Sequence, residues 1–103
     1  MPQYLHVGGL VAAGFDSSGT FLLTVSHSGR GLYAVGTWER VARNSTLTYP
    51  NQGRILGIGP IQDQIIEVVE THNELLRLSS PNGVYRLEYQ EGAIEIKTQS
   101  APP

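Results

Sequence analysis

The sequence predicts an all-β protein in which antiparallel meanders form a small sandwich or an open barrel. Two segments, 21–26 and 84–89, alternate between two sets of residues with the period of two that is typical of strands. Turns that contain glycine precede both segments, at 16–19 and 80–83. Charged residues make up only 16% of the chain, which is fewer than long solvent-facing helices need.

The first part of the chain is expected to hold four strands joined by tight turns. The Asp-Ser-Ser-Gly turn at 16–19 can cap its own backbone through its polar side chains, and its glycine supplies a positive φ. A fourth strand would place Trp38, Arg40 and Ala42 on one face and Arg43 on the other. The expected strands are residues 10–15, 21–26, 32–37 and 38–43.

The second part of the chain, 74–98, repeats this scheme. Asn82 and Gly83 close its first turn, and an Asn-Gly pair before alternating residues is the strongest short hairpin signal. Gly83 lies 64 residues after Gly19, and both are expected at a positive φ. We interpret the match as an internal repeat of a three-stranded meander, although any two glycine-turn hairpins share such a pattern. The residues expected to face the core are Phe21, Leu23, Val25, Tyr85, Leu87 and Tyr89.

The middle of the chain allows two interpretations. Residues 61–79 fit either a strand hairpin, with 65–70 turning through 71–73 into 75–79, or one short helix. The run Ile-Ile-Glu-Val-Val forms helices poorly and favours the hairpin. We expect a single β domain over residues 1–99 and a disordered tail at 100–103.

Composition excludes several classes of function. The chain has no cysteine, which removes disulfides and thiolate chemistry, and its start lacks the features of a signal peptide, so we expect a cytoplasmic protein. With a net charge of −2 and no basic stripe, no nucleic-acid partner is expected, and no segment is long and apolar enough for a membrane partner. His6, His27 and His72 are too scattered for a metal site, and no cofactor is expected.

One local cluster of positive charge could carry a function. Arg30, Arg40 and Arg43, together with His27, could hold a carboxylate or a phosphate through paired hydrogen bonds, or could form a solvated strand face. Trp38, the only tryptophan, could anchor an interface or fill the core.

No catalytic residues are predicted. Ser26, His27 and Asp16 contain the groups of a nucleophilic triad, but neighbouring residues on a strand point to opposite faces. Ser26 and His27 therefore cannot pair easily.

The segment 11–43 resembles a blade of a WD40-like β-propeller. The resemblance rests on an apolar strand, on Asp-Ser-Ser-Gly followed by Thr-Phe-Leu-Leu, on Ser-His-Ser-Gly, and on a strand that ends near Trp38 and Glu39. Residues 74–98 match more loosely, and the Gly-His and Trp-Asp pairs of the family are absent. Two or three blades cannot close a ring that usually needs 4–8. The resemblance implies a binding platform, built either as a small sandwich or open barrel or as a ring shared by several chains.

Two functions follow from these observations. The first is a non-catalytic interaction module that self-associates, binds a protein partner, or does both. The alternative is a small ligand-binding barrel or enzyme with an anion site near Arg30, Arg40 and Arg43. Charged residues are scarce, and Lys97 is the only lysine, although lysine commonly guards exposed sheet edges. We therefore expect a homo-oligomer, most simply a two-fold dimer.

Overall fold

Antiparallel strands account for nearly all the regular structure in the computed structural model, which describes residues 3–73 and 75–98. No α-helix occurs in that part of the chain, and therefore none that could span a membrane. A single 3-10 turn, η1 (Gly59–Ile61), lies between β6 and β7. The strands are β1 (Gln3–His6), β2 (Leu10–Phe15), β3 (Phe21–Ser26), β4 (Gly29–Ala34), β5 (Arg40–Asn44), β6 (Arg54–Leu56), β7 (Ile65–Glu67), β8 (Val69–Glu70), β9 (Leu76–Ser79), β10 (Tyr85–Gln90) and β11 (Ala93–Thr98).

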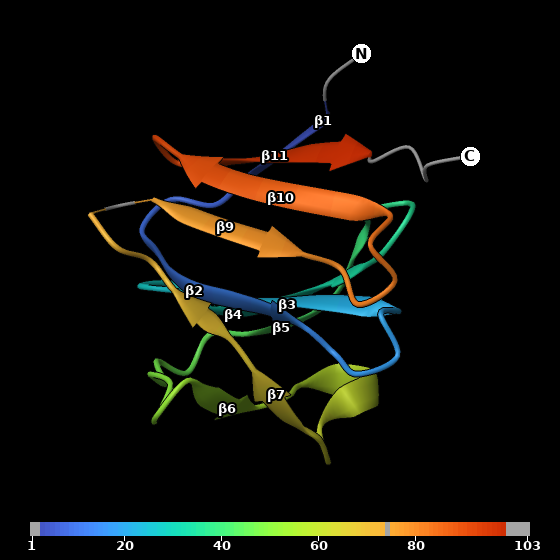
Figure 1. Ribbon diagram of the computed structural model, residues 1–103. Helices are drawn as coiled ribbons and strands as arrows, with labels where there is room; N and C mark the ends of the chain where they lie inside the picture. Colours follow the sequence, from blue (N-terminus) through green and yellow to red (C-terminus); the bar gives the residue numbers. More distant parts are fainter. Residues whose placement is uncertain (1–2, 74, 99–103) are drawn as a thin grey trace.

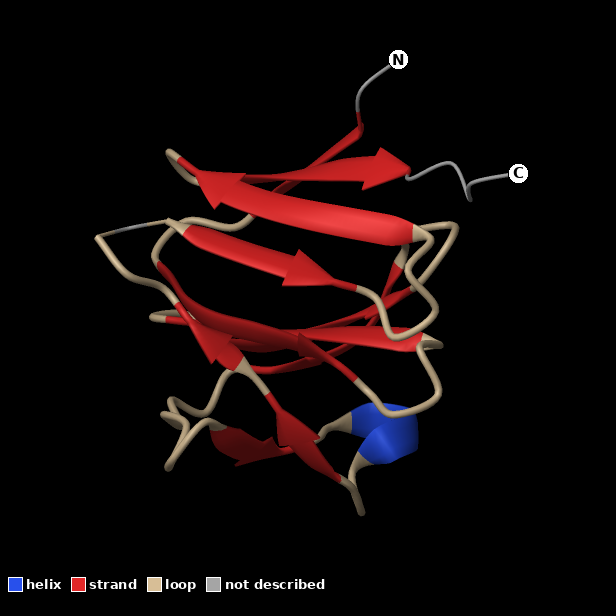
Figure 2. Ribbon diagram, in the orientation of Figure 1, coloured by secondary structure: helices blue, strands red, loops and turns tan. Residues whose placement is uncertain are grey.

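The strands form three sheets stacked as layers (Figure 1). The outer sheet has the order β1-β11-β10-β9, and the central sheet has the order β5-β4-β3-β2-β8. The β6–β7 hairpin, with η1 beside it, lies on the other side of the central sheet (Figure 2). The predicted all-β sandwich is confirmed, with the hairpin as an additional layer.

Two apolar clusters lie on opposite sides of the central sheet. One contains Leu22 and Trp38 together with apolar residues of the outer sheet, and the other contains Leu23 and Leu32 together with residues of the hairpin and η1. The six residues predicted to face the core are all covered: Leu23, Val25, Leu87 and Tyr89 are buried, and Phe21 and Tyr85 are partly buried.

Strand β3 is buried on both faces, which the alternation did not predict. Thr24 and Ser26 lie on the same face as Leu22 and are buried although they are polar. Each donates its hydroxyl to a carbonyl of β4, Thr24 to Gly31 and Ser26 to Gly29. These bonds satisfy the hydroxyls, so the polar side chains can lie beneath the outer sheet at little cost.

The hairpin approaches β2 closely where that strand has a glycine. A Cβ atom added at Gly14 would collide with the carbonyl oxygen of Glu67, at the end of β7. Glycine therefore lets the chain from β7 to β8 cross directly over β2. Beyond this crossing, β8 joins the central sheet by pairing with β2.

The predicted repeat is present in the turns and hairpins. In the first turn Asp16 accepts from the Phe21 amide with its Oδ1 atom at 2.9 Å, and in the second Ser80 accepts from the Tyr85 amide with its Oγ atom at 3.0 Å. Gly19 and Gly83 both have φ of +75°, as predicted. The hairpins that follow the two turns also share their register. Phe21 pairs with Ala34 in the first hairpin, and Tyr85 pairs with Thr98 in the second, so both members of the second pair lie 64 residues after those of the first.

Each repeat has a fourth strand, but the two fourth strands come from different parts of the chain. In the first repeat β5 follows β4 directly and pairs with it. In the second repeat the N-terminal strand β1 pairs with β11, with Leu5 opposite Ile94. Leu5 is buried against the central sheet, so β1 closes both the outer sheet and the core.

Three details of the predicted strands are wrong. The strand expected at 32–37 is shifted toward the N-terminus, since β4 spans Gly29–Ala34 and residues 35–37 form a turn. The fourth strand begins at Arg40, because Trp38 has φ of +60° and lies in the turn before it. The expected hairpin of 65–70 with 75–79 does not form, since β7 pairs with β6, β8 pairs with β2, and only the bridge from His72 to Leu75 remains.

The short helix considered for 61–79 is also wrong. Within the described residues of that range, the regular elements after η1 are strands, as the β-branched side chains favour. The predicted tail at 100–103 lies outside the described residues.

The burial of β3 predicts a large loss of stability when its core is truncated. Leu23 is fully buried, so Leu23→Ala should lower the free energy of unfolding by about 2–5 kcal/mol. Leu75→Ala, at a side chain that is 51% exposed, should change it by less than about 0.5 kcal/mol. Urea unfolding followed by the fluorescence of Trp38 measures both values. Equal losses in the two variants would contradict the two-sided core.

The pairing of β1 with β11 predicts that deleting β1 destabilises the protein, whereas transferring β1 to the C-terminus does not. Deletion of residues 1–6 should lower stability by at least about 2–5 kcal/mol, because it removes buried Leu5 and exposes the edge of β11. A circular permutant in which residues 1–6 follow residue 103 should fold normally, since the same hairpin then forms locally. Thermal unfolding compares the two proteins. A deletion variant as stable as the full chain would show that β1 does not hold the outer sheet.

Candidate functional site

Strand β5 is one of the two edge strands of the central sheet, and a β-bulge sets the directions of its side chains. The register places Ala42 opposite Leu32 and Arg40 opposite Tyr33, so Val41 is the extra residue. Without this bulge, Arg40 and Arg43 would point to opposite faces, as the sequence predicted. With it, both follow the same face as Gly31 and Tyr33, which are their partners on β4.

These side chains border a hollow between β5 and the end of β1. Gly31 is one of the residues that line this hollow. A Cβ atom added to Gly31 would lie 3.2 Å from Thr24 Oγ1 and 3.8 Å from Arg40 Cδ. The hollow has a volume of ≈ 230 Å³ and is open to solvent. We call it the basic hollow, and its principal lining residues are His6, Thr24, Tyr33, Arg40 and Arg43.

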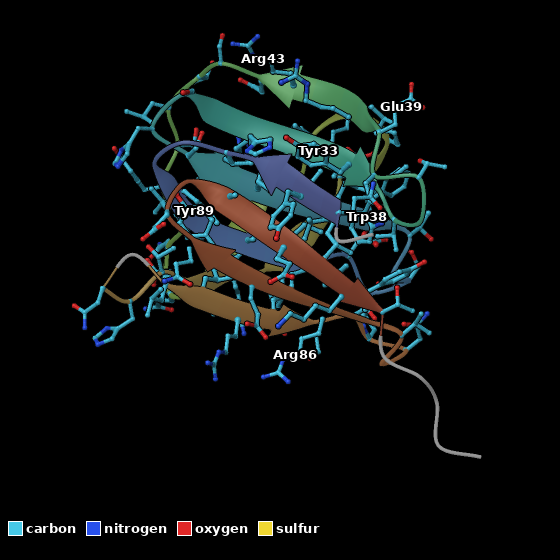
Figure 3. The ribbon with its side chains drawn as sticks, turned by 90° about the horizontal axis from the view of Figure 1, so that it is seen from above. Tyr33, Trp38, Glu39, Arg43, Arg86 and Tyr89 are labelled. Carbon is cyan, nitrogen blue, oxygen red and sulfur yellow. The ribbon has the colours of Figure 1, made fainter. Side chains whose placement is uncertain are left out.

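The outer sheet does not extend over this part of β5. Arg40, Val41 and Arg43 are exposed, and Tyr33 is half-buried. In Figure 3 Arg43 lies at the end of β5, beyond the strands of the outer sheet, while Arg86 lies on the opposite side of the molecule. The hollow is therefore open to solvent beside Arg40 and Arg43.

The charge of the basic hollow is not neutralised by the residues that line it. None of the described lining residues is an Asp or a Glu, and no ion pair within the described chain includes Arg40 or Arg43. The outer sheet differs, because Glu88 there contacts Arg86 at 3.3 Å and Lys97 at 3.4 Å. Two guanidinium groups can therefore donate hydrogen bonds to a carboxylate or a phosphate.

The structure separates Arg30 from the other two arginines. Arg30 borders the basic hollow, but its Nη1 donates to the carbonyl of Leu56 at 2.8 Å, on the hairpin side of the sheet. Its Nε is buried without a hydrogen-bond partner among the described residues. The guanidinium therefore ties β4 to β6 instead of completing a three-arginine cluster.

A second hollow lies on the other face of β5. It has a volume of ≈ 530 Å³ and is open to solvent. Most of its lining residues are uncharged, but Arg30 and Arg43 border it as well as the basic hollow, and Asp63 is its one carboxylate among the described residues. We call it the glycine hollow, and its principal lining residues are Ala42, Leu56, Gly57, Gly59, Gln62 and Asp63. The edge of β5 thus forms a ridge with a hollow on each side.

The remaining sequence candidates lie outside the basic hollow. Trp38 is buried, and its ring meets that of Tyr85 edge to face at 5.1 Å, so it packs the first repeat against the second. His27 packs on Gly9 and meets Tyr49 at 6.4 Å, and it does not line the basic hollow. Ser26 and Asp16 accept from backbone amides in two separate turns.

Sequence reasoning missed three contributors to the hollow. His6 comes from β1, whose place beside β4 and β5 depends on pairing with β11 at the other end of the chain. Thr24 and Tyr33 were expected in strands, but their place in the lining of the hollow was not predicted. No local pattern marks the bulge at Val41, because a bulge is a property of two paired strands.

Within the described part of the chain, no group of three His, Asp or Glu side chains could hold a metal ion. Comparison with family models, with curated proteins and with solved structures finds no match to this chain. The geometry of the β5 edge is therefore the basis on which a function can be argued.

Proposed function

We propose that this protein is a non-catalytic interaction module that binds protein partners at the free edge of β5. The observation that carries the proposal is the form of that edge: it ends the central sheet, it is exposed, and hollows lie on both of its faces. Sheet edges offer unpaired backbone groups, which a partner strand can satisfy. The cytoplasm is the location we propose for the module.

The composition of the edge supports this role. Natural edges are commonly guarded by lysine, by other charged side chains or by β-bulges; β5 has a bulge and two exposed arginines but no lysine. Its exposed apolar residue, Val41, is 45% accessible, and Leu47 in the following loop is 50% accessible. A partner that covers this edge would therefore bury apolar surface as well as pair with the backbone.

Selection of random peptides against the protein tests whether the β5 edge binds. Val41→Pro removes an amide donor from the middle of β5 and hinders strand addition, and the register pairs no residue of β4 directly with Val41. Peptides selected on the unmodified protein should bind Val41→Pro about tenfold more weakly, as expected from the loss of about one backbone hydrogen bond. Fluorescence anisotropy with labelled peptides gives the affinities.

Ser17→Pro is the matched control for this experiment. Ser17 is exposed in the first turn, and the second turn has Pro81 at the equivalent position, so proline fits there. Peptides should bind Ser17→Pro and the unmodified protein equally. If the selected peptides bind Val41→Pro as tightly as the control, or if no peptide is selected, the β5 edge is not the binding surface.

A second candidate function, self-association, has its own supporting observation. On the outer face of the β6–β7 hairpin, Leu56 and Ile65 are directly paired and are 49% and 63% exposed. The neighbouring pair on the same face joins Arg54 to Glu67. Two copies related by a two-fold axis can place the apolar pairs together and each Arg54 near Glu67 of the other copy. We propose a homodimer formed in this way.

Sedimentation tests the dimer. The unmodified protein should sediment at twice the 11.2 kDa of one chain, and Ile65→Lys should weaken the dimer at least about tenfold by placing a charge in an apolar interface. Val84→Lys, at an exposed residue of the second turn, should leave the dimer unchanged. A species of 11.2 kDa at micromolar concentration for the unmodified protein would rule the dimer out.

A further inference from the structure

We propose that the partner of β5 is an extended protein segment that has carboxylates at alternate positions and adds to the central sheet as its next strand. This inference rests on the proposed function and names the chemistry of the partner. It follows from three features of the edge: its free backbone, the two hollows, and the difference in charge between them.

The two hollows match the side-chain geometry of an added strand. Successive side chains of a strand point to opposite faces, so one set of alternate residues would enter the basic hollow and the other set the glycine hollow. The five residues of β5 can pair with about five residues of a partner, which is a length of roughly 17 Å. In this mode of recognition, backbone hydrogen bonds supply affinity and the hollows supply specificity.

Charge assigns a chemistry to each set of residues. In the basic hollow Arg40 and Arg43 have no carboxylate among the described lining residues, and the half-buried Tyr33 lies beside them. Alternate Asp or Glu residues of the partner would meet these guanidinium groups and form charge-assisted hydrogen bonds. The glycine hollow is less basic, because its lining adds the carboxylate of Asp63 to Arg30 and Arg43 and its other residues are uncharged, so it suits uncharged side chains of moderate size.

The same charges disfavour a second copy of this chain as the partner of β5. If two copies paired β5 with β5 about a two-fold axis, Arg40 and Arg43 of one copy would lie beside those of the other. Like charges that face each other across strands are destabilising. The partner segment should instead carry the opposite charge.

A synthetic peptide tests the inference directly. The probe is a blocked seven-residue peptide, Thr-Glu-Val-Glu-Val-Glu-Thr, labelled with a fluorophore and titrated with the full chain in an anisotropy assay. It should bind saturably, and it should bind Arg40→Gln/Arg43→Gln about tenfold more weakly, since two exposed ion pairs are lost. The control variant Arg77→Gln/Arg86→Gln has the same change in net charge on the outer sheet and should bind like the unmodified protein.

Two further peptides separate charge from strand addition. A peptide with Lys in place of Glu should not bind detectably. The Glu peptide with methyl groups on alternate backbone nitrogens keeps its charge but cannot pair with β5 through those nitrogens, and it should bind at least about tenfold more weakly, as expected from the loss of one or more backbone hydrogen bonds. Thermal unfolding of each variant confirms that the fold is intact.

The outcomes distinguish this inference from the proposed function. If the Lys peptide binds as tightly as the Glu peptide, and both lose affinity in Val41→Pro, the edge binds strands but the assignment of an acidic partner is wrong. If the methylated peptide binds as tightly as the Glu peptide, the hollow is a simple anion site and strand addition is wrong. The same conclusion follows if one concentration of inorganic phosphate displaces the Glu peptide and the methylated peptide equally. If peptides bind but Val41→Pro does not weaken them, the proposed function fails as well.

Discussion

Strand β3 has buried side chains on both faces, with Leu22 and Leu23 pointing in opposite directions and both fully buried. Such a strand requires a covering layer on each side, because each buried leucine contributes about 1.5–3 kcal/mol relative to an exposed one. The outer sheet covers the side of Leu22, and the β6–β7 hairpin with η1 covers the side of Leu23. The order of the layers and the need for β1 to complete the outer sheet both follow from this requirement.

The proposed binding surface lies where this cover ends. The central sheet continues to β5, but the outer sheet leaves Arg40 and Arg43 exposed and Tyr33 half-buried. On the outer sheet, where Glu88 and Glu95 face Lys97, opposite charges are already paired. At β5 the bulge at Val41 brings two arginines to one face, and no described carboxylate pairs with either. An accessible edge and an unneutralised charge therefore coincide, and this coincidence is the basis of the proposed function.

The sequence predicted features that depend on local chemistry. The turns that end at Gly19 and Gly83, the alternation after them, and the strand character of 65–70 all follow from residue types within a few positions. Features that depend on pairing between distant segments could not be predicted. The bulge at Val41 exists only relative to β4, and His6 reaches the basic hollow only because β1 pairs with β11. Arg40 and Arg43 were therefore expected on the correct strand but on opposite faces, and Arg30, which also borders the basic hollow, has a bond to the Leu56 carbonyl that the sequence did not indicate.

Hydrogen exchange of the native protein tests the central claim, that the doubly covered β3 holds the structure together. Amides of β3 that pair with β2 and β4 should exchange only through global unfolding and should be the most protected in the protein. Amides of β5, at the uncovered edge, should exchange through local opening at a lower free energy. If instead the amides of β10 and β11 are the most protected while those of β3 exchange by local opening, the outer sheet is the stable unit and β3 does not hold the structure together.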